Sequence, residues 1–301
     1  MAHRIFDGVL DLVGGTPLVR LPKLRPEGGA EVLGKLESAN PAGSVKDRPA
    51  LWMIRRAERE GKLKPGATIV EATSGNTGIS LAMICAVRGY RCAIIMPEDM
   101  SQARRDILKA YGAEVVLTPA EEGMAGAVEK AEAMVRKKDA FWVGQFDNPA
   151  NPEAHAETTA EEIWEATGGE LDAFVAGVGT GGTLTGVGRV LRERKEGLRL
   201  VAVEPRASAV LSGGKPGLHG IQGLGAGFVP EVLDESLIDD IVTVTDLAAD
   251  RMMRRLAREE GLLLGPSAGA NVHAAREVAR RMEPGQRVVT ILCDTGERYF
   301  S

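Results

Sequence analysis

Short apolar runs alternate with amphipathic segments along most of the chain. Eight runs rich in β-branched or aliphatic residues predict buried strands at 31–37, 68–72, 92–97, 114–118, 173–178, 198–205, 240–244 and 287–293. Apolar residues with helical spacing lie between them, at about 46–60, 77–88, 101–111, 123–138, 153–166, 181–196, 247–260 and 268–282. Strands that are apolar on both faces are typical of a parallel sheet covered by helices. We therefore expect an α/β fold with mainly parallel, twisted sheets.

Polar residues and glycines mark several ends of the expected helices. Ser101 and Asp246 stand where a helix is expected to begin, and both residue types are good N-caps. Glycine readily takes the left-handed conformation that ends a helix. It follows four of the segments, at Gly61, Gly89, Gly112 and Gly261.

Two stretches rich in proline and asparagine, NPAG and FDNPANPEAH, interrupt the alternation. We predict that the chain crosses there between two subdomains. The smaller would comprise residues 41–147, and the larger residues 1–40 together with 148–301. Residues 206–235 are rich in glycine and proline and show no clear period. A loop of this length in a compact domain is more often functional than neutral.

Composition excludes several classes of protein. The chain has 301 residues, 26% of them charged, and a formal net charge of −5. It therefore has no basic field that would attract nucleic acid or anionic lipid. No run approaches the ~20 apolar residues that span a bilayer, and the first residues do not resemble a signal peptide. We expect a cytoplasmic protein with neither nucleic-acid nor membrane partners.

The cysteines and histidines give no sign of a metal site. Cys85 and Cys293 lie in apolar runs and are expected in the core rather than in disulfides. None of the four histidines is spaced for metal ligation with another histidine or with a cysteine. We therefore expect no bound metal.

Two segments share the order strand, loop rich in glycine and hydroxyl residues, then helix. One loop reads TSGNTG and begins at Thr73, and the other reads GTGGT and begins at Gly179. Backbone N–H groups at the start of a helix bind phosphate or carboxylate, and glycine lets the anion come close. Such turns also occur in α/β proteins where they bind nothing. Two of them in one chain favour anion binding.

The second loop also fits the pattern G-x-G-x-x-G, from Gly177 to Gly182, and Glu204 ends the next expected strand. This pattern is that of a dinucleotide-binding site, in which the acidic residue binds the ribose. An NAD-dependent dehydrogenase is therefore an alternative. It leaves TSGNTG and Lys46 without a role.

Lys46 lies in NPAGSVKDR, where a helix is expected to begin. It is either a solvated lysine or one that forms a Schiff base with a carbonyl cofactor. Pyridoxal phosphate needs such an amine, an anion site for its phosphate, a partner for its ring nitrogen and a contact to its ring hydroxyl. Ser267, in GPSAGA, could pair with the ring nitrogen or could simply cap the helix that follows.

Six segments of the chain resemble the cysteine synthase family, also called the O-acetylserine sulfhydrylases. They are NPAGSVKDR, EATSGNTGISLAM, QFDNPANPEAH, GVGTGGTLTGVGR, GPSAGA and GERYFS, in the order that the family has them. The resemblance runs from residue 14 to residue 301. It implies pyridoxal 5′-phosphate as cofactor and the two-subdomain fold of the fold-type II enzymes, similar to the β subunit of tryptophan synthase.

The resemblance implies a role for each matching residue. Lys46 would bind the cofactor covalently, Asn76 would contact its ring hydroxyl, and Ser267 would pair with its ring nitrogen. The phosphate would lie on a loop formed by Gly179, Thr180, Gly181, Gly182 and Thr183. The substrate α-carboxylate would be bound by Thr73, Ser74, Gly75, Thr77 and Gln145. Lys35 and Arg48 are left as surface or structural charges, and Asp47 has no assigned role.

The implied reaction is a β-replacement in which sulfide takes the place of the acetate of O-acetyl-L-serine and gives L-cysteine. Lys46 would be covalent anchor, general base and general acid. A cystathionine β-synthase, or a serine or threonine dehydratase, is an alternative. Some segments resemble the A isozyme type and others the B type, so thiosulfate as sulfur donor and O-phosphoserine as substrate stay open. Family members are usually homodimers, and some bind the C-terminal tail of serine acetyltransferase.

Overall fold

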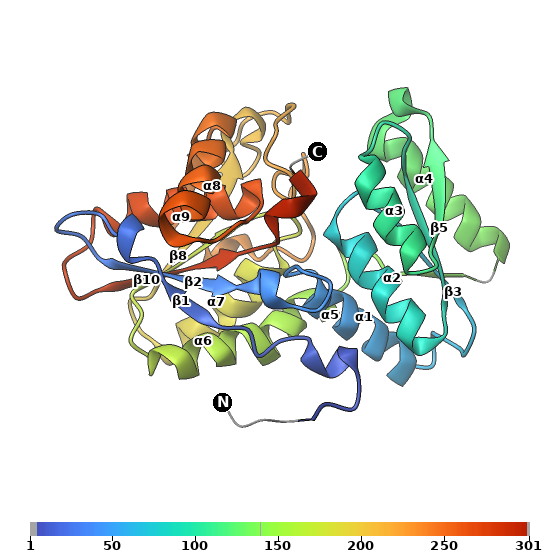
Figure 1. Ribbon diagram of the computed structural model, residues 1–301, viewed down its shortest axis with the longest axis horizontal. Coiled ribbons are helices and arrows are strands. Elements are labelled where there is room, and N and C mark those ends of the chain that lie inside the picture. Colours follow the sequence, from blue (N-terminus) through green and yellow to red (C-terminus); the bar gives the residue numbers. More distant parts are fainter. Residues whose placement is uncertain (1–4, 139, 300–301) are drawn as a thin grey trace.

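The strands of the computed structural model form two sheets, each lying between helices, and these are the two lobes in Figure 1. The model describes residues 5–138 and 140–299. The larger sheet has the strand order β1-β2-β10-β7-β8-β9, and the smaller has the order β5-β4-β3-β6. All neighbouring strands in these sheets run parallel except β1 and β2. The predicted α/β fold with mainly parallel sheets is confirmed.

All eight predicted strands are present, with ends that agree to within one residue. The larger sheet consists of β1 (Leu18–Arg20), β2 (Glu31–Leu36), β10 (Arg287–Leu292), β7 (Ala173–Gly177), β8 (Arg199–Pro205) and β9 (Asp240–Val244). The smaller consists of β5 (Glu114–Thr118), β4 (Arg91–Pro97), β3 (Thr68–Ala72) and β6 (Ala140–Trp142). The prediction missed β1 and β6, because three residues are too few to show a period.

The predicted helices are also present. They are α1 (Asp47–Arg59), α2 (Asn76–Arg88), α3 (Gln102–Ala110), α4 (Gly123–Lys138), α5 (Ala150–Ala154), α6 (Ala160–Thr167), α7 (Gly182–Arg194), α8 (Asp246–Glu260) and α9 (Pro266–Ala279). The segment predicted as one helix at 153–166 is interrupted, because a π-helical turn, His155–Thr159, joins α5 to α6.

Each sheet separates two apolar cores. In the larger sheet Val175 packs with α8 and α9, whereas its neighbour Phe174 packs on the other face with α6 and α7. In the smaller sheet Ile69 packs with α1, α2 and α3, and Val70 packs with α4. Successive residues of one strand are thus buried on opposite faces, as the apolar runs predicted. Because α1 joins the core of the smaller sheet, we propose the boundaries 41–147 for this subdomain, with 1–40 and 148–301 in the other.

The helix ends differ from the prediction at two caps. Thr245, not Asp246, caps α8, and its side chain accepts a hydrogen bond from the Ala248 N–H group. Asp246 is the first helical residue, and its carboxylate accepts instead from the Gly220 N–H group at 2.7 Å. Ser101 stands at the N-cap of α3 without a capping hydrogen bond. The four predicted terminal glycines all have positive φ.

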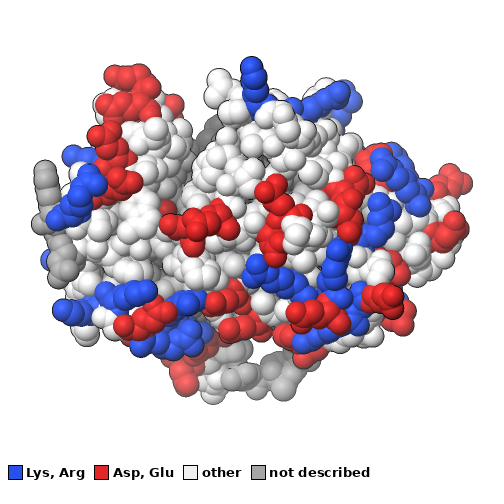
Figure 2. All heavy atoms as spheres, turned by 180° about the vertical axis from the view of Figure 1, so that it is seen from behind, with Lys and Arg blue, Asp and Glu red and all other residues white. Residues whose placement is uncertain are grey.

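Residues 209–234 contain neither helix nor strand, so the predicted loop is present. Within the described ranges, no helix is long and apolar enough to cross a bilayer. Figure 2 shows acidic and basic side chains interspersed over one face of the molecule, without a continuous basic surface there.

Candidate active site

Lys46 stands at the N-cap of α1, at the end of a turn bonded to the segment that follows β10. The Val45 N–H group donates to the Cys293 carbonyl at 2.8 Å, and the Thr295 N–H group donates to the Gly43 carbonyl at 3.2 Å. Gly43 has a φ of 79°, which favours glycine. Desolvation lowers the pKa of the Lys46 amine below its usual value of 10.5. A larger neutral fraction makes the amine a better nucleophile.

The predicted phosphate loop, residues 179–183, joins β7 to α7. Gly181 has a φ of 84°, and a Cβ on Gly179 would overlap the Gly223 carbonyl oxygen. Among the described residues, no hydrogen-bond partner of the backbone N–H groups of Gly179, Thr180, Gly181 or Thr183 is present. These donors lie at the positive end of a thirteen-residue helix. The loop therefore has the free N–H donors and the helix start that the predicted anion site needs.

The threonine side chains of this loop contact two residues of the segment that begins with α5. Asn151 donates through Nδ2 to Thr180 Oγ1 at 3.0 Å and to the Gln145 carbonyl at 2.8 Å. Thr183 Oγ1 lies 3.2 Å from His155 Nε2. Desolvation lowers the pKa of His155 well below its usual value, so this imidazole is neutral at physiological pH.

Ser267 lies in the first turn of α9 and is buried. It does not cap that helix, because Gly265 stands at the N-cap, so the capping alternative is wrong. Its hydroxyl interacts with the Cys293 thiol, and its Cβ would be 3.8 Å from a Cβ on Gly223. Ser267 therefore lies beside Cys293, whose carbonyl bonds to the Lys46 turn, and beside Gly223, whose carbonyl lies against Gly179.

The residues predicted to bind the substrate carboxylate follow β3 and lead into α2. Thr77 donates through Oγ1 to Gln145 Oε1 at 2.7 Å, which brings together two residues far apart in the sequence. Thr73 Oγ1 accepts from the Gly75 N–H group at 3.1 Å, and Arg104 Nη1 donates to the Ser74 carbonyl at 2.9 Å.

Asn76, the first residue of α2, connects this loop to the segment after β10. Its Nδ2 lies 2.7 Å from Asp294 Oδ2, and its Oδ1 accepts from Arg298 Nη1 at 2.5 Å. The sequence analysis gave no role to Arg104, Asp294 or Arg298. The only signal for the last of these was GERYFS, one of the segments that carried the family resemblance.

Arg48 and Lys35 are not surface charges, because both side chains are at most 1% exposed. Arg48 forms ion pairs with Glu37 and Glu162, both at 2.7 Å, and Lys35 pairs with Glu162 at 2.5 Å. Glu37 is fully buried as well. The alternative of structural charges is therefore the correct one for both residues.

Asp47 fixes the start of α1. Its Oδ2 accepts from the Ala42 N–H group at 2.6 Å, and its Oδ1 accepts from Ser80 Oγ at 2.5 Å. The first bond closes the turn before Lys46, and the second ties α1 to α2. Desolvation raises the pKa of Asp47 to about 6.

Glu204 is not available to bind a ribose. Its carboxylate accepts from the Leu211 N–H group at 2.9 Å and from the Ser212 N–H group at 3.0 Å. The buried carboxylate thus anchors the long loop after β8. This arrangement removes the acidic residue on which the dinucleotide alternative depended.

These features fit pyridoxal phosphate. They bring together an amine with a lowered pKa, a helix start with free N–H donors, a buried serine hydroxyl and a fixed amide. Among the described residues, no group of three or more His, Cys, Asp and Glu is placed to hold a metal ion.

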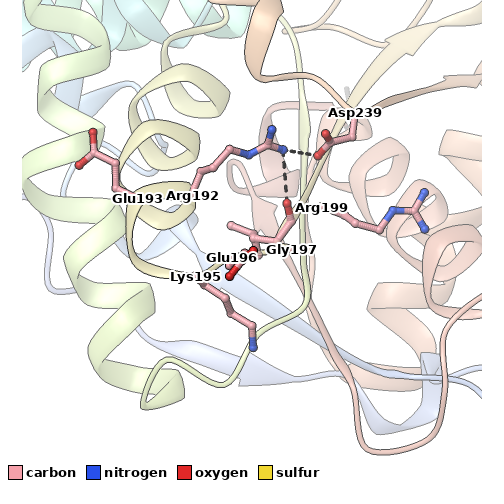
Figure 3. A pocket seen from close by; sticks show the side chains of 8 residues that line it. Arg192, Glu193, Lys195, Glu196, Gly197, Arg199 and Asp239 are labelled. Atoms are coloured by element: carbon pink, nitrogen blue, oxygen red, sulfur yellow. Dashed lines mark hydrogen bonds and ion pairs between the residues drawn. The ribbon is translucent and has the colours of Figure 1, made fainter.

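A surface hollow at the other end of α7 is separate from this site. Figure 3 shows its lining, in which Arg192 bonds to Asp239 and to the Leu198 carbonyl. α7 is about 20 Å long at 1.5 Å per residue, so its whole length separates the hollow from the phosphate loop.

Comparisons with known proteins identify the family of the chain. A family model described as "Pyridoxal-phosphate dependent enzyme" matches residues 9–294. The curated cysteine synthase of Staphylococcus aureus is 53% identical over 302 residues, which cover 100% of this chain and 97% of that protein. The structure of an O-ureido-L-serine synthase has a TM-score of 0.96 at 49% identity and covers 99% of this chain and 94% of its own. That of a cysteine synthase from Entamoeba histolytica has a TM-score of 0.96 at 44% identity, covering 100% and 91%.

Proposed function

The chain belongs to the family of pyridoxal-phosphate-dependent enzymes, and from this premise we propose that it is a cysteine synthase. It would replace the acetate of O-acetyl-L-serine with sulfide and release L-cysteine. The observation that supports the proposal most is that the Lys46 turn, Ser267 and Asn76 all contact residues 293–298. The loop 179–183 adds N–H donors that have no partner among the described residues. The full-length similarity to a cysteine synthase supports the reaction class.

We assign the cofactor contacts as follows. Lys46 would hold pyridoxal phosphate covalently, the N–H groups of residues 179–183 would bind its phosphate, Ser267 would pair with its ring nitrogen, and Asn76 would donate to its ring oxygen. When bound, this cofactor supplies an electron sink that makes the substrate Cα–H group acidic.

The substrate α-carboxylate would bind at the start of α2. The backbone and hydroxyl donors there belong to Thr73, Ser74, Gly75 and Thr77, and Gln145 adds an amide from the turn after β6. Binding at a helix start orients the substrate, because the carboxylate is attracted to the positive end of α2.

The Lys46 amine would take the α-proton and later return a proton to the same carbon. Its lowered pKa suits this role, since the base must be neutral when substrate is bound. Ser267 is a neutral partner and would not hold the ring nitrogen protonated as a carboxylate does. We infer that a neutral serine at this position shortens the lifetime of negative charge at Cα and thereby favours prompt loss of acetate.

Steady-state turnover tests the proposal most directly. O-Acetylserine, O-phosphoserine and serine would each be paired with sulfide, thiosulfate and homocysteine. We expect the highest kcat/KM for O-acetylserine with sulfide, and loss of both activity and visible cofactor absorption in Lys46→Ala. A wild-type protein that prefers serine and homocysteine would instead be a cystathionine β-synthase, and one that makes a keto acid from serine or threonine would be a dehydratase.

The similarity to an O-ureido-L-serine synthase favours a second candidate. Replacement at the same β-carbon with hydroxyurea as nucleophile would give O-ureido-L-serine. Adding hydroxyurea to the panel separates the two, because the candidates differ in the attacking group.

We further propose a homodimer in the cytoplasm. Val9 and Leu12 are 36% and 44% exposed, and Ile5 is 96% exposed, so the N-terminal segment offers an apolar surface to a second copy. The tail of a serine acetyltransferase is a possible ligand of the active site. Light scattering at several concentrations tests the dimer, and competition of the tail peptide with O-acetylserine tests the partner.

A further inference from the structure

Charged groups on both sides fix the orientation of the Asn76 amide. An asparagine amide can turn by 180° with little change of shape, which exchanges its oxygen for its nitrogen. A guanidinium only donates hydrogen bonds and a carboxylate only accepts them. Arg298 therefore requires the oxygen on its side at 2.5 Å, and Asp294 requires the nitrogen on its side at 2.7 Å. One N–H of Asn76 bonds to Asp294, and the second is left for a ligand.

Arg298 also connects this amide to the turn that carries Lys46. Its Nη2 donates to the Ala42 carbonyl, while Nη1 donates to Asn76. Gly43 makes room for the guanidinium, because a Cβ there would lie 2.9 Å from Nη2. One side chain thus bonds both to the start of α2 and to the turn before the reactive lysine.

Asp294 has a second hydrogen-bond donor besides Asn76, and both bonds go to the same carboxylate oxygen. The side chain is 1% exposed, and its Oδ2 accepts from the Tyr299 hydroxyl at 2.5 Å as well as from Asn76. The Arg104 guanidinium lies 5.4 Å from the centre of the Tyr299 ring. This packing leaves the carboxylate little freedom to turn away from Asn76.

We propose that Arg298 and Asp294 are positioning residues that hold the Asn76 amide with one N–H directed at the ring oxygen of the cofactor. Neither side chain has to touch a reacting atom for this purpose. The inference rests on the proposed cofactor site and is independent of which substrate the enzyme uses.

The test measures cofactor binding in the absence of substrate. The Kd for pyridoxal phosphate and the visible absorption of the bound cofactor would be compared in wild type, Asn76→Ala, Arg298→Gln and Asp294→Ala. We expect Kd to rise about tenfold or more in each variant, because the ring oxygen of the cofactor loses a positioned hydrogen-bond donor. The absorption should shift in the same direction in all three variants.

The double variant tests whether Arg298 affects cofactor binding by positioning Asn76. In the Asn76→Ala background, Arg298→Gln should change Kd by less than about twofold, because the amide that it positions is gone. Arg298→Lys keeps the charge but cannot reach both acceptors, and we expect an intermediate loss. This variant keeps the inference testable should Arg298→Gln fold poorly.

Arg276→Gln is a matched control. Arg276 is also partly exposed and also donates to a backbone carbonyl, that of Leu24, at 2.6 Å. It lies nine residues beyond Ser267 on α9, so its loss should leave Kd and the absorption unchanged.

Two results would overturn the inference. One is wild-type cofactor binding and absorption in Arg298→Gln, and the other is an undiminished effect of that change in Asn76→Ala. A wild-type protein that binds no pyridoxal phosphate would overturn the proposed function as well, so the two failures are distinguishable.

Discussion

Arg48, two positions after Lys46, carries a buried charge. Its buried guanidinium pairs with the fully buried Glu37 and with the partly exposed Glu162, which pairs in turn with Lys35. Taking these charges out of water is costly, so the network is weak support for stability as such. Its geometry, however, fixes the first turn of α1 against the end of β2. We infer that the network holds Lys46 in one place.

Removing Arg48 should therefore be strongly destabilising. Arg48→Met removes the cation that pairs with the fully buried Glu37 carboxylate. We expect a loss of about 3–5 kcal/mol in the free energy of unfolding. Urea unfolding monitored by circular dichroism measures it. Arg254→Met is the control, because Arg254 forms an exposed pair with Asp250 and its loss should have no measurable effect. Equal stability of both variants would contradict the role given to the network.

Glu71 is a buried carboxyl group near the end of β3. Its Oε2 accepts from the Gly144 N–H group at 3.1 Å, next to Gln145. Desolvation raises the pKa of Glu71 from 4.5 to about 8. The folded protein thus holds this proton more tightly than the unfolded chain does. The free energy of unfolding therefore falls over the pH range in which the unfolded chain has released the proton and the folded protein has not.

We expect a pH-dependent difference between wild type and Glu71→Gln. The contribution of this group is fully present below pH 4.5 and falls as pH rises to about 8. The amide does not titrate, so the variant should gain stability relative to wild type across that range and then keep a constant difference. Urea unfolding at several pH values measures it. A difference that does not change with pH would show that Glu71 is not protonated at neutral pH in the folded protein.

At the scale of elements, the phosphate loop depends on how closely α7 approaches the segment of α5 and the π-helical turn. A Cβ on Gly186 of α7 would overlap the Pro152 carbonyl oxygen and lie 2.9 Å from the His155 Cβ. The absence of a side chain there lets Asn151 reach Thr180 at the start of the same helix. Gly186 thus affects the phosphate loop indirectly, from about one turn further along α7.

Gly186→Ala should push these two segments apart. Overpacking of this kind typically costs about 1–3 kcal/mol, and here we also expect weaker binding of pyridoxal phosphate, because the loop 179–183 moves with α7. Thermal unfolding and cofactor titration measure the two effects. Gly8→Ala is the control, since nothing lies within 4 Å of a Cβ at that position. A stable variant with unchanged cofactor binding would contradict this account.

At the scale of the molecule, the residues of the candidate site come from both sheets. The phosphate loop follows β7 of the larger sheet, whereas Asn76 follows β3 of the smaller. α1 and α5 pack together between the lobes, as Figure 1 shows. A ligand bound to both halves should therefore stabilise both.

Cofactor binding should protect both lobes from unfolding. A ligand at 100 times its Kd stabilises the native state by about 2.7 kcal/mol. We expect a higher Tm with pyridoxal phosphate and slower hydrogen exchange in both 76–88 and 182–194, and a much smaller effect in Lys46→Ala. Protection confined to the larger sheet would contradict a site that both sheets share.

The sequence predicted the elements better than it predicted what holds the site together. Eight strands were found because each is a continuous apolar run, while β1 and β6 were missed because they are short. Local motifs drew attention to Lys46, Ser267 and the glycine loops, whereas Asn76 was proposed from the family resemblance. The bonds from Asn76 to Asp294 and Arg298 join positions more than 200 residues apart, and no local pattern reports such contacts.

The bonds between residues 43–45 and 293–295 have a consequence for synthesis on the ribosome. β10 lies between β2 and β7, so the larger sheet has an unfilled place until residues 287–292 have been made. The lysine is translated early, but the carbonyl and amide groups that fix its turn appear about 250 residues later. Nascent chains and products of premature termination should thus carry Lys46 in a turn that has only local bonds, such as the one from Ala42 to Asp47. Binding of pyridoxal phosphate to a nascent chain would then show that residues 287–295 have been translated.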